Sequence, residues 1–122
     1  MNTSAKRILI VEDDPDITFV LVALLEEVGY AVSTAERGEE LAHLDTSALP
    51  DLIVLDLYLS GLDGRQIARQ LKGQEATRQI PIVMLSAHPD APQDAKDAGA
   101  DAFLAKPFDL DMVLQTVNTF LA

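Results

Sequence analysis

The chain has 122 residues, 48% of them hydrophobic and 24% charged, which is typical of one soluble globular domain. It has no cysteine, which excludes disulfide bonds and thiolate metal sites, and no apolar stretch approaches the length of a membrane span. A net charge of −11 argues against direct binding to nucleic acid or to an anionic membrane.

Strand-like apolar segments alternate with helix-like segments along the chain. Strands are predicted at residues 7–11, 30–34, 51–55, 80–85 and 102–105. Helices are predicted at residues 15–28, 38–44, 63–71, 90–98 and 110–121. This alternation predicts a doubly wound α/β fold, in which one parallel sheet carries helices on both faces. No signal peptide precedes the first strand, so we expect a cytoplasmic protein with one domain over residues 1–122.

The first predicted strand ends in an acidic segment, Glu12-Asp13-Asp14-Pro15. Pro15 suits the first position of a helix, so we interpret Asp14 as its N-cap rather than as a ligand. Glu12 and Asp13 remain as acids at the strand end, and Asp56 follows the apolar third strand. If the first and third strands are neighbours, these three carboxylates converge at the carboxyl edge of the sheet, where open parallel sheets bind ligands.

Such a cluster needs charge compensation, because neighbouring carboxylates repel each other strongly. An all-oxygen site with few protein ligands suits Mg²⁺. Ser86 and Lys106 end the fourth and fifth strands at the same edge. A hydroxyl, an ammonium group and a divalent cation around one carboxylate can together hold a phosphoryl group. Asp56 is therefore predicted to be a nucleophile that takes up phosphate.

Five segments occur in a fixed order over almost the full chain: ILIVEDDP, DLIVLDL, GLDG, IPIVMLSA and GADAFLAKPF. In these segments the chain resembles the receiver domains of two-component response regulators. The resemblance implies a flavodoxin-like (βα)5 fold whose five parallel strands have the order 2-1-3-4-5. It also implies that a histidine kinase or a phosphotransfer protein donates a phosphoryl group from a phosphohistidine to Asp56.

The resemblance further implies which residues hold the metal ion. Asp13 and Asp56 would bind Mg²⁺ directly, and the backbone carbonyl of Tyr58 would be a third ligand. Glu12 would act mainly through water.

Two residues would contact the phosphoryl oxygens, namely Ser86 and Lys106. The domain would then phosphorylate and dephosphorylate itself rather than act as a conventional enzyme. Phe103 stands at the aromatic switch position and, with Ser86, would relay phosphorylation to the last two helices and the strand between them. An unidentified downstream protein, or a second copy of the chain in a phosphorylation-dependent homodimer, would bind that surface.

The sequence departs from the family pattern at several positions near the acceptor. Ser60 replaces the usual proline after the third strand, and Phe103 lacks the hydroxyl of the commoner tyrosine. Tyr58 and His88 flank the path of water to the phosphoryl group. Because the Tyr58 ring excludes solvent, we expect it to shield the phosphate and to make self-dephosphorylation slow.

Other interpretations of these residues stay open. Glu12 and Asp13 could be solvated loop charges, and Phe103 could be a core residue. A catalytically silent pseudo-receiver would use the same fold only to bind other proteins. A phosphatase with an aspartyl nucleophile would need a second acid where Tyr58 stands. A flavin-binding module would need a Ser/Thr/Gly-rich loop where the chain has VEDDPD.

Overall fold

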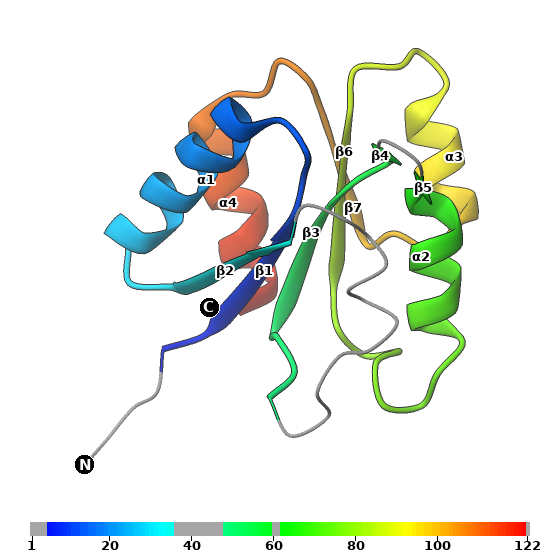
Figure 1. The fold of residues 1–122 in the computed structure, drawn as a ribbon, viewed down its shortest axis with the longest axis horizontal. Coiled ribbons are helices and arrows are strands. Elements are labelled where there is room, and N and C mark those ends of the chain that lie inside the picture. The colour runs from blue at the N-terminus through cyan, green and yellow to red at the C-terminus, as the bar shows by residue number, and fades with distance from the viewer. Residues whose placement is uncertain (1–4, 36–47, 60–61, 122) are drawn as a thin grey trace.

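The structure, a computed structural model, describes residues 5–35, 48–59 and 62–121. Within these residues, one sheet has five parallel strands in the order β2-β1-β3-β6-β7 (Figure 1). The strands are β1 (Arg7–Val11), β2 (Ala31–Ala35), β3 (Leu52–Asp56), β6 (Ile82–Ser86) and β7 (Ala102–Ala105). Counted along this sheet, the order is 2-1-3-4-5, so the expected flavodoxin-like arrangement is confirmed.

Helices cover both faces of the sheet. Four are described: α1 (Pro15–Glu27), α2 (Gly64–Lys72), α3 (Ala91–Asp97) and α4 (Leu110–Leu121). Figure 1 shows α1 and α4 on one face, with α2 and α3 on the other. The helix predicted at residues 38–44 lies outside the described residues, as does Ser60. No helix in the described part of the chain is long and apolar enough to cross a membrane.

The alternating side chains of the strands build a separate apolar core on each face of the sheet. Leu52 and Val54 of β3 belong to the core beneath α1 and α4, whereas Ile53 and Leu55 belong to the core beneath α2 and α3. Because both faces are covered, every residue of β3 is buried, including the carboxylate of Asp56.

The central strands begin and end later than the sequence pattern predicts. Asp51 lies just before β3, where its side chain accepts a hydrogen bond from the Arg7 backbone N–H at 2.7 Å. At the other end, Asp56 pairs with Leu85, and the Leu57 N–H still donates to the Leu85 carbonyl at 2.9 Å. Asp56 and Ser86 are therefore the last residues of their strands, rather than residues of the loops that follow.

A short antiparallel hairpin, which the sequence pattern does not predict, follows β3. It pairs β4 (Tyr58–Leu59) with β5 (Leu62–Asp63) and leads directly into α2. Gly64 opens α2 so close to β3 that a Cβ atom there would lie 2.5 Å from the Asp56 carbonyl oxygen and 2.7 Å from that of Leu57. Only glycine fits this approach, which places the start of α2 against the backbone of Asp56.

Candidate functional site

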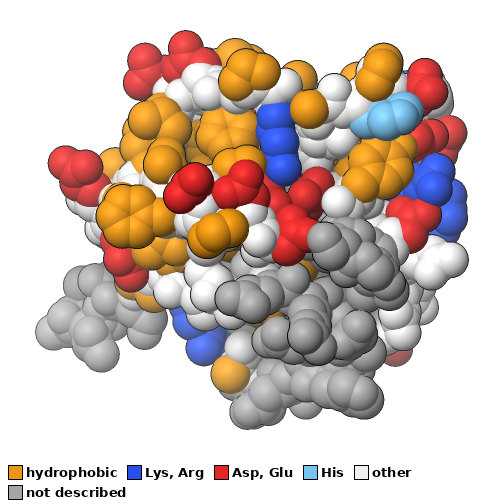
Figure 2. Space-filling model, turned by 45° about the horizontal axis from the view of Figure 1, so that its top comes forward, with side chains coloured by type: hydrophobic (Ala, Val, Ile, Leu, Met, Phe, Trp, Pro, Cys, Tyr) orange, Lys and Arg blue, Asp and Glu red, His pale blue; other side chains and the backbone are white. Residues whose placement is uncertain are grey.

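Three carboxylates meet at the carboxyl edge of the sheet. Glu12 and Asp13 follow β1, and Asp56 ends the neighbouring strand β3. One oxygen of each residue lies within 4.8 Å of the other two. Glu12 is 2% and Asp56 6% exposed, whereas Asp13 is exposed to solvent. Figure 2 shows acidic side chains gathered in the middle of this face, with a basic side chain directly beside them.

Lys106 reaches two of these acids from the end of β7. Its Nζ donates to Glu12 Oε1 at 2.7 Å and to Asp56 Oδ2 at 3.4 Å. Burial lowers the pKa of Lys106, but the hydrogen bond to Glu12 and the charge of Asp56 outweigh this effect and raise it overall. The peptide bond from Lys106 to Pro107 is cis. The lysine therefore stays cationic at the centre of the acid cluster.

Glu12 uses both of its carboxylate oxygens within the protein. While Oε1 accepts from Lys106, Oε2 accepts from the backbone N–H groups of Asp13 at 3.0 Å and Asp14 at 3.2 Å. Burial raises the pKa of Glu12 to about 7; the hydrogen bond from Lys106 opposes this shift, and the neighbouring Asp56 adds to it. Glu12 thus holds the loop after β1 in place, while Asp13 projects from that loop into the site.

The two residues expected to relay phosphorylation lie on β6 and β7. Ser86 is buried at the end of β6, next to Asp56, and its Oγ accepts a hydrogen bond from the His88 backbone N–H at 3.1 Å. The Lys106 N–H donates to the Ser86 carbonyl at 2.9 Å, which ties the two strand ends together. Phe103 pairs with Met84 across the strands and packs, half-buried, against the core beneath α2 and α3.

The two residues expected to flank the water path touch each other. The rings of Tyr58 and His88 have centroids 5.2 Å apart and meet edge to face. Two partners of Tyr58 were missed by the sequence reasoning: its hydroxyl donates to Asp94 of α3, and the Arg65 guanidinium lies over its ring. The hydrogen bond to Asp94 raises the pKa of Tyr58. No sequence signal joins Tyr58 to Asp94, because the contact depends on where α3 packs.

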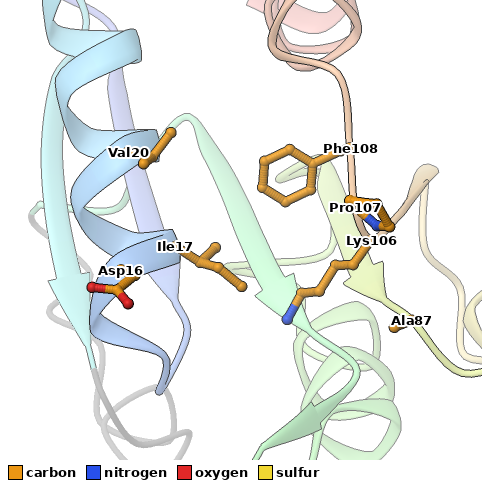
Figure 3. Close-up of a pocket in the computed structure, with 7 residues that line it drawn as sticks. All are labelled: Asp16, Ile17, Val20, Ala87, Lys106, Pro107 and Phe108. Atoms are coloured by element: carbon orange, nitrogen blue, oxygen red, sulfur yellow. The ribbon is translucent and has the colours of Figure 1, made fainter.

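An apolar pocket of about 490 Å³ adjoins the acid cluster (Figure 3). Seven residues line it: Asp16, Ile17, Val20, Ala87, Lys106, Pro107 and Phe108. In Figure 3, Lys106 extends along the pocket so that its amine points toward the end of β3, with Ile17 of α1 facing it and Phe108 above. The lysine therefore has an apolar wall on one side and the carboxylates on the other.

Comparison with known proteins places the chain in a family. Residues 8–118 match the family model of the response regulator receiver domain. The chain is 37% identical over 119 residues to Protein PilH of Pseudomonas aeruginosa, covering 95% of this chain and 98% of PilH. It spans about half the length of other curated relatives that it matches.

Solved structures agree with this assignment. The signal receiver domain of a signal transduction histidine kinase from Syntrophus aciditrophicus has 34% identity and a TM-score of 0.87, covering 96% of this chain and 90% of that one. The receiver domain of a sensor histidine kinase from Pseudomonas aeruginosa has 30% identity and a TM-score of 0.85, covering 96% and 98%; its structure has a magnesium ion coordinated in the active site cleft. The present chain therefore belongs to the receiver domains of two-component response regulators.

Proposed function

We propose that Asp56 is the phosphoacceptor of this receiver domain and that a phosphohistidine protein is its donor. One observation carries the proposal: a buried carboxylate ends the central strand with Glu12 and Asp13 within 4.8 Å and the Lys106 ammonium 3.4 Å away. Burying a carboxylate beside two other acids is costly even when it is paired, and a chemical use for Asp56 would explain why the fold keeps it there. Taking up a phosphoryl group is a use that fits every residue of the cluster.

In the transfer step, a carboxylate oxygen of Asp56 attacks the phosphorus of the donor's phosphohistidine. A P–O bond forms, the P–N bond breaks, and the donor imidazole leaves and takes up a proton. Lys106 and the Ser86 hydroxyl would bind oxygens of the transferred group, since Ser86 ends the strand next to β3 and Lys106, which follows β7, already reaches Asp56 Oδ2 at 3.4 Å. Charge-assisted hydrogen bonds of this kind stabilise the negative charge on the phosphoryl oxygens.

The donor set also fits a magnesium ion. All three clustered side chains offer carboxylate oxygens, which are the ligands that Mg²⁺ prefers. Asp13, Asp56 and the Tyr58 carbonyl would hold the ion, which supplies the positive charge that lets an anionic donor approach three carboxylates. Because both oxygens of Glu12 already accept hydrogen bonds within the protein, an indirect role through water suits this residue.

Phosphorylation would be read out on α3, β7 and α4. The new phosphoryl group would draw Ser86 toward Asp56, and the half-buried ring of Phe103 would move into the space left behind. A downstream protein or a second copy of the chain would bind the altered surface. Amide exchange with and without beryllofluoride should differ across residues 86–110; a difference confined to the loop around Asp56 would contradict this relay.

Labelling with acetyl phosphate and Mg²⁺ tests the acceptor directly. Mass spectrometry should find the added phosphoryl group on the peptide that contains Asp56, and Asp56→Asn should abolish it. Asp51→Asn is the matched control, because Asp51 precedes the same strand at its opposite end and should leave labelling intact. Full labelling of Asp56→Asn would exclude Asp56 as the acceptor.

A further inference from the structure

Tyr58 is held by α3 through a set of contacts that lies outside the acid cluster. Its hydroxyl donates to Asp94 Oδ2 at 2.7 Å, and the Arg65 guanidinium carbon lies 5.7 Å from its ring centroid. Arg65 Nη1 is also 3.6 Å from Asp94 Oδ2. We call Tyr58, Arg65, His88 and Asp94 the tyrosine clamp, because together they join the start of α2 to α3.

The base of the clamp is fixed. Arg65 binds the carboxylate of Asp63, the N-cap of α2, with its Nε 3.0 Å from both oxygens and its Nη2 2.6 Å from Oδ2. Such a bidentate pair orients the guanidinium in one plane. Arg65 is therefore fixed to the start of α2, whereas the position of Asp94 depends on that of α3.

The clamp is also anchored to the candidate site through two backbone hydrogen bonds. The Tyr58 N–H donates to Asp56 Oδ1 at 3.2 Å, and the His88 N–H donates to Ser86 Oγ at 3.1 Å. Their two rings meet between the loops that follow the paired strands β3 and β6. The ring contact thus lies on the side of the site toward α3.

The third feature is the weakness of α3 itself. The helix has only seven residues, and its N-cap residue, Asp90, makes no side-chain capping hydrogen bond. Its buried residues, Ala91 and Ala95, are small and bury little apolar surface. A helix held this loosely depends on each polar contact, so the bond from Tyr58 to Asp94 matters for its position.

We propose that Asp94 is a positioning residue that acts through Tyr58: it holds the ring against His88, and the position of α3 thereby controls the access of water to a phosphoryl group on Asp56. When α3 moves away, the ring loses its anchor and water reaches the phosphorus in line with the Asp56 oxygen. Attack by water would break the P–O bond to Asp56 and release inorganic phosphate and the free carboxylate. This inference rests on the proposed function of Asp56.

Amide exchange of the unphosphorylated chain tests the clamp without any phosphoryl chemistry. Tyr58→Phe keeps the ring but removes the donor, and Asp94→Ala removes the acceptor. Each should lower the protection of residues 91–97 by about three- to tenfold, as the loss of one hydrogen bond implies. The double variant should lose no more than Asp94→Ala alone, because that change already breaks the bond that Tyr58→Phe removes.

Asp97→Ala is the matched control for that experiment. Asp97 is an exposed acid on the same helix, and it accepts from Gln93 Nε2 within α3 rather than from another element. Its effect on exchange should add to that of Tyr58→Phe. Fully additive effects of Tyr58→Phe and Asp94→Ala would overturn the clamp.

Release of phosphate after removal of the donor tests what the clamp does. Asp94→Ala should speed the loss of phosphate by about two- to tenfold. The loss of one hydrogen bond changes the ratio of shielding to open positions of the ring by no more than that factor. Asp94→Asn should lie close to the parent, because its amide oxygen still accepts from the Tyr58 hydroxyl. Tyr58→Asn, which removes the ring, should give the fastest loss.

The outcomes separate the two proposals. An unchanged or slower loss in Asp94→Ala would overturn the shielding role, even if exchange in α3 rises. If the parent is not labelled at all, the proposed function of Asp56 fails and the shielding role fails with it. The exchange experiment would still decide whether the clamp holds α3.

Discussion

The two edges of the sheet use charged residues in opposite ways. At the amino edge, Asp101 Oδ2 accepts from the Ile82 N–H and from Lys72 Nζ, both at 2.8 Å. At the carboxyl edge, Glu12, Asp13 and Asp56 gather around Lys106, so negative charge exceeds positive charge among the described residues that meet there. Charges at the amino edge therefore stabilise the fold, while those at the carboxyl edge favour a cationic ligand.

Removing an acid from the amino edge should have the largest effect on stability. Asp101→Ala leaves the N–H of the buried Ile82 without its acceptor and Lys72 without its carboxylate. We expect the free energy of unfolding to fall by about 2–3 kcal/mol, measured by urea denaturation. The exposed Asp97→Ala should change it by less than about 0.5 kcal/mol. If Asp101→Ala lowers the free energy of unfolding by as little as Asp97→Ala does, the contacts of Asp101 do not stabilise this edge.

At the carboxyl edge, stability should depend on pH through Glu12. Burial raises its pKa in the folded chain to about 7, from a usual value of 4.5. The folded chain thus keeps a proton that the unfolded chain loses, so stability is greatest at low pH and falls as pH rises from about 5 to 7. We expect a loss of roughly 2 kcal/mol over this range without metal.

Glu12→Gln isolates that contribution, because the amide keeps the shape of the side chain and does not titrate. The difference in unfolding free energy between the variant and the parent should widen steadily from pH 5 to 7. A difference that stays constant over this range would show that Glu12 does not carry the pH dependence.

Magnesium should stabilise the carboxyl edge by a smaller amount. At ten times its dissociation constant, Mg²⁺ should raise the free energy of unfolding by about 1.4 kcal/mol. Asp13→Asn should lose most of this response. Asp14→Asn should keep it, because Asp14 caps α1 through Oδ1, and asparagine caps helices equally well. Calorimetry over a Mg²⁺ titration measures the shift in melting temperature of each variant. Equal shifts in Asp13→Asn and Asp14→Asn would remove Asp13 from the proposed ligands.

The sequence pattern predicted the features that depend on local chemistry. Apolar segments located the strands, and the Asp14-Pro15 pair located the start of α1, where Asp14 accepts from two backbone N–H groups. Strand order brought Glu12, Asp13 and Asp56 together, because β1 and β3 are neighbours. Their chemical roles stay predictions until the experiments above are done.

Other features depend on tertiary packing and could not be predicted. The strands β4 and β5 of the hairpin have two residues each, which is too short to show a periodic pattern in the sequence. Lys106 lies closer to Glu12 than to Asp56, a preference set by how the strand ends align. The bond from Tyr58 to Asp94 joins residues 36 positions apart, on elements whose packing no local signal specifies.

Gly64 has a consequence for anyone who redesigns this domain. Replacing a helical glycine with alanine is a routine way to raise stability, because alanine restricts the unfolded chain and favours the helix. Here the added methyl group would collide with the carbonyl oxygen of Asp56 itself, 2.5 Å away. A substitution chosen to raise stability would instead displace the backbone of Asp56, so thermostabilising libraries should leave this position fixed.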